Sequence, residues 1–447
     1  MTSKKAPAEL SGARRFAARF FSDYGMLAVL LLLVVFFSMV TIEKHKPVGA
    51  DAAQSVARQI AASQGGRVLV VARTSAPDTD FASALDGLLK ARGIEVIGPV
   101  VGEPRDIRLA FESAAQAGTP VSVIATTERN AWMVDQIKSQ VGALAQTRVV
   151  IPESYRWPVF LRSDNLINVA NQIVVIAIIA IGMTMVIITG GIDLSVGSLI
   201  ALSAVVTGSL IARLGGTTAS PLAMLAASLG AMLLCGVVGL FSGLMVAAFR
   251  MPPFIATLGM MLVASGAAYL ISGGESLYQI PDGFVWLGRG TAFLGIPNAV
   301  VLMVILYAVA HVLMSRMTLG RYIYAVGGNV EAARLSGVNV TAVLLFVFGA
   351  SGLMAGLGGG VLTSQLKSGA PTYGLLYELY AIAAAVLGGT SLAGGQGKVL
   401  GTLIGALIIG VIQNGMNLTG IQSYTQKVVL GLVILGAVLL DMLRRKD

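Results

Sequence analysis

A single carboxylate, Asp193, interrupts an apolar stretch that otherwise runs from 169 to 206, and Ser195 and Ser198 follow it closely. An ionised side chain at the centre of a bilayer costs about 2.5 to 3.5 kcal/mol on insertion scales, so such residues usually face a protein interior or a watery path. Asp193 is therefore expected either to contribute to a path through the membrane or to cap a helix that begins at Leu194 by accepting free backbone N–H groups.

The residues before Asp193 predict a break in a membrane helix. Gly190 and Gly191 follow Thr189, and backbone can leave the helical hydrogen-bond ladder at membrane depth only where it is buried in protein or lines a cavity. Broken helices of this kind hold coupling ions in secondary transporters. An ion-coupled secondary transporter, with Asp193 as a cation or proton site, is therefore one functional alternative.

The sequence offers no site for a nucleotide or a metal ion. No G-x-x-x-x-G-K-[ST] motif occurs, and Gly397-Lys398-Val399 lacks the hydroxyl that would bind magnesium. Cys235 is the only cysteine, and the two histidines are far apart in the sequence. We expect this chain to bind no cofactor, so that any ATP hydrolysis that it uses takes place on another chain.

Three glycine-rich motifs together resemble the ribose-type permease subunits of bacterial ATP-binding-cassette (ABC) sugar importers. They are 189–198 (TGGIDLSVGS), 319–329 (LGRYIYAVGGN) with AARLSG at 332–337, and 388–397 (GGTSLAGGQG) with GTLIGA at 401–406. Each motif is long, and they occur in the order found in that family. The resemblance covers about 22 to 41 and 160 to 442.

This resemblance implies a function and a set of partners. It implies a permease subunit, not an enzyme, that imports a simple sugar such as ribose, xylose or galactose. A separate ABC ATPase would bind ATP and magnesium, a periplasmic sugar-binding protein would deliver the cargo, and a second permease copy would complete a homodimer.

The resemblance also implies which loop meets the ATPase. In the family, a cytoplasmic loop presents short helices to a groove on the ATPase, and the matching loop here is 316–340. An ordinary charged loop is the alternative interpretation. The predicted coupling residues are Arg321, Asn329, Glu331, Arg334 and Ser336.

Amide, hydroxyl and carboxylate side chains within the apolar segments are candidates for a sugar path, because such groups can exchange hydrogen bonds with sugar hydroxyls and still release them. Hydrogen bonding between helices is the alternative use. Tyr380 stands where the family commonly has aspartate, so a second acid near Glu378 is absent. The predicted path residues are Asn168, Asn171, Gln172, Asp193, Ser195, Thr257, Glu378, Gln413, Asn414 and Asn417.

The composition indicates that a bundle of membrane helices positions these residues. The 447 residues are 55% hydrophobic and 12% charged, with a mean hydropathy of +0.81, which is typical of a polytopic membrane protein in a lipid bilayer. Because a spanning helix needs about 20 apolar residues, we predict about ten transmembrane helices. The apolar segments are 24–41, 166–189, 193–213, 221–248, 253–272, 296–315, 341–363, 376–393, 399–418 and 425–442.

The net charge of +9 is read as a topology signal and not as a sign of nucleic-acid binding, because the basic residues concentrate at segment ends and in the N-terminal tail. With a basic cytoplasmic tail and an uncleaved first helix at 1–43, most basic residues of the short loops fall on the cytoplasmic side. Arg213, Arg289, Lys367 and Lys427 fall outside. The predicted location is the bacterial cytoplasmic (inner) membrane.

A segment of different character, 44–158, separates the first predicted helix from the permease domain at 159–447. Strand-like runs at 67–72, 94–101, 120–126 and 148–151 alternate with helical patterns at 81–91, 106–117 and 130–145. This alternation predicts a small doubly wound α/β domain with a parallel sheet, and the topology places it outside the cytoplasm.

The residues from 68 to 132, above all 82–96 (ASALDGLLKARGIEV), resemble one lobe of a type I periplasmic sugar-binding protein. Because one lobe lacks half of a two-lobed cleft, the resemblance implies a docking or spacer role, with ligand binding as the alternative. A membrane-anchored sensor, whose outer domain binds a ligand, is the remaining functional alternative.

Overall fold

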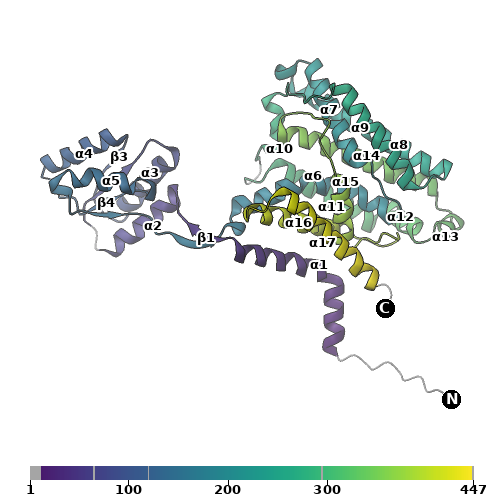
Figure 1. Cartoon of the computed structure of the whole chain (residues 1–447), viewed down its shortest axis with the longest axis horizontal. Helices are drawn as coiled ribbons and strands as arrows, with labels where there is room; N and C mark the ends of the chain where they lie inside the picture. The colour runs from purple at the N-terminus through teal and green to yellow at the C-terminus, as the bar shows by residue number, and fades with distance from the viewer. Residues whose placement is uncertain (1–11, 64–65, 119, 293–294, 445–447) are drawn as a thin grey trace. The chain divides into compact units, whose positions relative to one another are not determined.

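The computed structural model describes residues 12–63, 66–118, 120–292 and 295–444 (Figure 1). The chain divides into two compact units. One is Ile42–Pro158, called the insert below; the described residues before and after it form the other, called the membrane unit.

Helices dominate the membrane unit, as expected for a polytopic membrane protein. Among the described residues, seven helices are long and apolar enough to cross a bilayer, and three shorter apolar stretches lie in further helices. The seven are α6 (Ser163–Ile188), α7 (Val196–Arg213), α8 (Pro221–Phe249), α9 (Pro253–Ser272), α11 (Asn298–Arg316), α14 (Val340–Leu366) and α16 (Val399–Leu418). The shorter stretches lie in α1 (Gly12–Val40), α15 (Tyr377–Leu387) and α17 (Ser423–Arg444).

All ten predicted apolar segments therefore fall on helices, but their lengths differ from the prediction. The segment predicted at 376–393 forms only the 11 residues of α15. Gly388 and Gly389 end this helix, and Gly389 has a φ of +81°, which glycine adopts without strain. The connections between spans include the short helices α10 (Trp286–Arg289), α12 (Thr318–Gly328) and α13 (Val330–Leu335).

The predicted break within the first motif is present. Helix α6 ends at Ile188 and α7 begins at Val196, two residues after the predicted start. Gly190 adopts a φ of +83° and turns the chain out of the helical path. The break belongs to the described core, since both Asp193 and Ser195 are fully buried.

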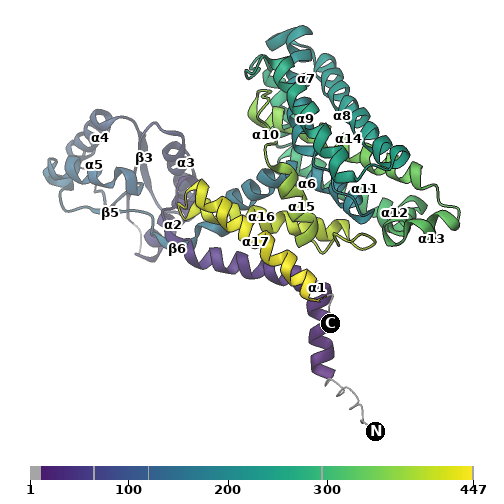
Figure 2. The same ribbon diagram turned by 45° about the vertical axis from the view of Figure 1, so that its right-hand side comes forward.

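Helix α14 lies at the centre of the packing and runs beside α8, as Figure 2 shows. Glycines allow this approach: a Cβ atom on Gly239 would lie 2.3 Å from the carbonyl oxygen of Phe348, and one on Gly352 would lie 2.2 Å from that of Cys235. The helices thus meet backbone to backbone, which is how small residues bring membrane helices together.

The insert contains a four-stranded parallel sheet in the order β3-β2-β4-β5. A separate antiparallel ribbon joins its two ends, with Ile42 paired to Pro158 and His45 to Tyr155. The sheet strands are β2 (Val68–Ala72), β3 (Val96–Val101), β4 (Val123–Ala125) and β5 (Arg148–Val150), and the ribbon strands are β1 (Ile42–His45) and β6 (Tyr155–Pro158).

Helices cover both faces of this sheet (Figure 1). Val68 and Val70 pack with α2 and α3, whereas Leu69 and Val71 pack with α4 and α5, because successive side chains of a strand point to opposite faces. The four predicted strands and three predicted helices are present. The ribbon and α2 were not predicted. The helices are α2 (Gly49–Ala62), α3 (Ala76–Lys90), α4 (Pro104–Gln116) and α5 (Glu128–Ser139).

The close crossing of α8 and α14 can be tested with two alanine substitutions on the same helix. Gly352→Ala forces a methyl group against the Cys235 carbonyl, and overpacking of this kind costs roughly 1–3 kcal/mol. Gly360→Ala meets no heavy atom within 4 Å and should be neutral or slightly stabilising. Thermal unfolding of both variants in one detergent measures the difference, and equal midpoints would contradict the crossing.

Candidate functional site

Asp193 holds the break between α6 and α7 in place. Its Oδ1 accepts hydrogen bonds from the Ser195 backbone N–H (3.0 Å) and the Ser195 hydroxyl (2.6 Å), and its Oδ2 accepts one from Ser351 Oγ (2.7 Å) on α14. All three residues are buried. The carboxylate therefore satisfies a backbone N–H just before α7 and also links the break to α14.

Thr257 connects the same break to α9. Its Oγ1 accepts a hydrogen bond from the Leu194 backbone N–H (3.1 Å) and lies within donating distance of the Pro253 and Ile192 carbonyl oxygens (2.9 and 3.1 Å). Three of the predicted path residues, Asp193, Ser195 and Thr257, thus share one buried hydrogen-bonded cluster, called the break cluster below. None of them is among the residues that line the cavity described next.

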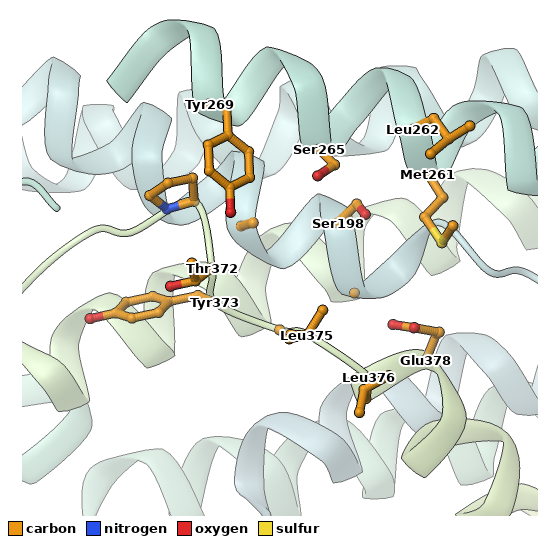
Figure 3. A pocket seen from close by; sticks show the side chains of 14 residues that line it. Ser198, Met261, Leu262, Ser265, Tyr269, Thr372, Tyr373, Leu375, Leu376 and Glu378 are labelled. Atoms are coloured by element: carbon orange, nitrogen blue, oxygen red, sulfur yellow. The ribbon is translucent and has the colours of Figure 1, made fainter. Parts of the chain in front are cut away.

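A cavity of about 200 Å³ lies beside the start of α7. In Figure 3 the side chains of Ser265 and Tyr269 extend from α9 toward the segment that leads into α15, and the Glu378 carboxylate faces the same space. Ser198 and Thr372 add two further hydroxyl groups, and Met261 and Leu262 contribute apolar surface. The lining offers several hydroxyls and one carboxylate, a set that can exchange hydrogen bonds with a polar, uncharged molecule.

The backbone around the cavity depends on a glycine from the first motif. A Cβ atom on Gly197 would lie 2.1 Å from Glu378 Oε2 and 2.6 Å from the Gly374 carbonyl oxygen. Leu376, at the N-cap of α15, has a φ of +68°, a left-handed conformation that is costly for leucine. The Glu378 carboxylate therefore occupies space that any side chain at 197 would fill.

The non-helical segment between α14 and α15 is joined to the loop that follows α9. Leu277 and Gly369 exchange backbone hydrogen bonds of 2.8 and 2.9 Å. Lys367 also bonds the exposed carboxylate of Asp282, and this hydrogen bond lowers the pKa of Asp282 from its usual value. These contacts hold one end of the cavity wall.

The remaining predicted path residues lie elsewhere. Asn414 forms a reciprocal pair of amide hydrogen bonds with Asn165 (2.9 and 3.0 Å). Asn171 and Asn417 accept hydrogen bonds from Gln365 and Gln426, respectively. Asn168 and Gln172 are exposed and Gln413 is half-buried.

Of the predicted path residues, Glu378 alone lines the cavity. Sequence reasoning missed Ser198, Ser265, Tyr269 and Thr372. The one available signal was the position of Ser198 in the first motif, one residue after the glycine that makes room for Glu378.

The five predicted coupling residues are all exposed on or beside α12 and α13. Arg334 forms an ion pair with Glu331 (2.9 Å), and Asn329 caps α13 by accepting a hydrogen bond from the Ala332 backbone N–H (3.0 Å). Arg321 lies on α12, where its guanidinium is 3.4 Å from Thr318 Oγ1, and Ser336 is the C-cap residue of α13.

The three glycine-rich motifs meet at one point. A Cβ atom on Gly394 would lie 2.8 Å from the Gly327 carbonyl oxygen and 3.2 Å from Gly190 Cα. The Gly395 backbone N–H donates to the Ile188 carbonyl (2.8 Å), and Tyr324 Oη donates to the Gly397 carbonyl (2.8 Å). Helix α12 is therefore in direct contact with the break after α6; this contact is called the glycine junction below.

Comparison with known proteins identifies the family of this bundle. Residues 165–438 match the family described as "Branched-chain amino acid transport system / permease component". The ribose import permease protein of Escherichia coli (strain K12) is 45% identical over 315 residues, which cover 70% of this chain and 94% of that protein. The chain belongs to the ribose-type permease family of ABC importers.

Other relatives of this permease have similar names. The ribose import permease protein of Bacillus subtilis (strain 168) is 43% identical over 318 residues, covering 70% of this chain and 96% of that protein. The D-allose transport system permease protein of Escherichia coli (strain K12) is 40% identical over 287 residues, covering 64% of this chain and 86% of that protein. No solved structure matches the permease significantly. Because its relatives are permease components, the chain is a transport subunit and not an enzyme.

The break cluster of this permease predicts that Ser351 has a larger effect on stability than other buried serines. Ser351→Ala removes the donor to Asp193 Oδ2, and a buried polar group left without its partner costs about 1–3 kcal/mol. Ser242→Ala is the control, because the equally buried Ser242 hydroxyl bonds only the Val238 carbonyl of its own helix. Thermal unfolding should show the larger loss for Ser351→Ala, and equal losses would refute the link.

Proposed function

We propose that this chain is the membrane subunit of an ATP-driven importer for a simple sugar. The observation that carries the proposal is the 45% identity to a ribose import permease over 94% of that relative. Relatives named for D-allose and fructose import also match, which supports a monosaccharide as the cargo of this chain.

The cavity beside α7 supports a sugar path. Its hydroxyl groups and the Glu378 carboxylate can bind the hydroxyls of a neutral sugar, while the apolar surface of Met261 and Leu262 can contact the sugar ring. Glu378 accordingly takes the role of a hydrogen-bond acceptor for the cargo. The break cluster, in contrast, takes a structural role, in which Asp193 shapes the start of α7 without contacting the sugar.

The same cavity supports a homodimer. Several lining residues lie on the outer face of a single chain: Leu375 is 74% exposed, Leu262 66% and Tyr269 45%. In a lone chain the polar lining would face lipid, where polar groups lack hydrogen-bond partners. A second copy would cover this face and enclose the path between two subunits.

The exposed α12–α13 segment supports an ATPase partner, on which ATP and magnesium would bind. Leu335 is 89% exposed and Met317 50%, and exposed apolar side chains of this kind suit a protein contact. The glycine junction then connects that contact to the break after α6. ATPase closure would move α12 and, through it, the start of α7. The family also implies a periplasmic sugar-binding protein as the third component.

The contacts of the membrane unit support ten spans in the inner membrane, with the insert outside the cytoplasm. The topology count places residues 190, 327 and 394 on the cytoplasmic side, and these three meet at the glycine junction. It places Leu277 and Gly369 outside, and they exchange backbone hydrogen bonds. Helices α1 and α17 supply two spans beyond the seven long ones, and the 11 residues of α15 together with the non-helical segment before them supply the tenth.

The ATPase contact predicts the effect of reversing one charge. Arg334→Glu should leave the permease inserted in the membrane but lose ATP-dependent sugar uptake and co-purification of the ATPase. Uptake into proteoliposomes and a pull-down of the ATPase measure the two effects. Normal uptake by this variant would refute the assignment.

A double variant separates docking from local stability. Glu331→Arg combined with Arg334→Glu keeps an ion pair within α13 but reverses its surface charges. If Arg334 contacts the ATPase, the double variant remains defective, whereas recovery of uptake would show that the residue only stabilises α13.

Removal of the insert tests its independence from the membrane unit. Lys44 pairs with Arg156 in the ribbon, so the ends left by deleting 48–155 lie side by side and a short flexible linker can join them. The shortened chain should still insert and bind the ATPase, because a domain with its own core can be removed at its linkers. Uptake at low sugar concentration should fall if the insert receives the binding protein. Loss of ATPase binding would contradict the independence of the two units.

A further inference from the structure

The strand order of the insert creates a crevice at the carboxyl ends of β2 and β4. From β2 the chain crosses through α3 to β3 on one side, and from β4 it crosses through α5 to β5 on the other. The two crossing helices pack on opposite faces of the sheet. In open α/β sheets, ligands bind where neighbouring connections diverge in this way.

A buried polar cluster occupies this point. Asp78, from the first turn of α3, accepts hydrogen bonds from Thr127 Oγ1 (3.2 Å) and Asn130 Nδ2 (2.9 Å), which follow β4. Asp78 is 3% exposed and Asn130 2%. A carboxylate so far from solvent needs partners, and each of its oxygens can accept more hydrogen bonds than the cluster supplies.

Two cavities of about 310 and 340 Å³ adjoin this cluster, and both are lined by Asp78 and Arg129. The smaller one is also lined by Arg73 and Ser75. Ser75 Oγ is buried and has no hydrogen-bond partner, although Ser75 occupies the N-cap position, where a serine normally bonds the helix backbone. Ser75 thus lines the cavity with a hydroxyl whose hydrogen-bonding capacity is unused.

The charges around the cavities decide which ligand fits. Three cations, Lys46, Arg73 and Arg129, are balanced by three carboxylates: Asp78, Glu103 and Glu128. Arg73 is paired with Glu103 (2.8 Å) and Lys46 with Glu128 (2.9 Å). The buried Asp78 carboxylate would repel an anion, and the cavities have no surplus of positive charge to offset that repulsion. A neutral polyol, in contrast, can bond the cationic donors and the carboxylate acceptors together.

We propose that the carboxyl edge of the insert's sheet binds a neutral polyol of about monosaccharide size. This site is additional to the membrane cavity and goes beyond the proposed transport function. It also differs from the docking or spacer role that a single lobe implies. The crevice is bounded by one sheet domain only, so the binding is expected to be weak and readily reversible.

The test uses the full chain in lipid nanodiscs, because sugar-headed detergents would compete for the site. Saturation-transfer difference NMR measures the binding of D-ribose, D-allose and D-fructose. The chain that lacks 48–155 supplies the signal of the membrane cavity alone. At least one of the three sugars should give a stronger saturation-transfer signal with the full chain than with the shortened chain. Inorganic phosphate should not displace that sugar.

Two substitutions locate the site. Ser75→Ala removes a hydroxyl without an internal partner, so folding is unaffected, and the loss of one hydrogen bond should weaken binding by about two- to tenfold. Arg129→Ala should weaken it by about tenfold or more. Ser83→Ala on α3 and Arg108→Ala on α4, which do not line the cavities, are the matched controls.

Three results would overturn the proposal. They are equal sugar signals from the full and the shortened chain, displacement of the sugar by phosphate, and unchanged affinity in both Ser75→Ala and Arg129→Ala. Each leaves the transport function untouched, because uptake and ATPase binding are measured separately.

Discussion

A bilayer core contains no water to bond free backbone groups, so a membrane helix can be interrupted only where the protein itself supplies the missing partners. In this chain Asp193 and Thr257 supply them at the break between α6 and α7, and Ser351 donates a hydrogen bond that holds the Asp193 carboxylate. The rest of the site depends on this arrangement. The break determines where α7 starts, and the first residues of α7, Gly197 and Ser198, form one wall of the cavity.

Close backbone contact is the second constraint, and glycine provides it where segments of the membrane unit pack against one another. Helices α8 and α14 cross at Gly239 and Gly352 without intervening side chains. The glycine junction brings α12 against the end of α6 in the same way. Because packed interiors are dense, α12 and the break after α6 form one closely packed contact.

The insert is stabilised differently, because its two cores remove apolar side chains from water. Its sheet separates two cores, one with α2 and α3 and one with α4 and α5. Only the β1–β6 ribbon leads the chain in and out of this unit. The parallel strand order that builds the two cores also directs the loops after β2 and β4 to one edge, and this places Asp78 beside Thr127 and Asn130.

Local sequence determined the class of fold, the break, and four strands and three helices of the insert. Each of these depends on composition or periodicity over a few residues, such as the two glycines before Asp193 or the alternation of strands and helices. Only the tertiary structure decided which polar residues meet. Asp193 lies in a buried cluster with Ser351, 158 positions away. The Glu378 carboxylate faces a cavity whose hydroxyl groups come from α7, α9 and the segment before α15. Helices that are apolar on all sides carry no periodic signal for the face that each side chain occupies, so the partners of these polar groups are set by helix packing.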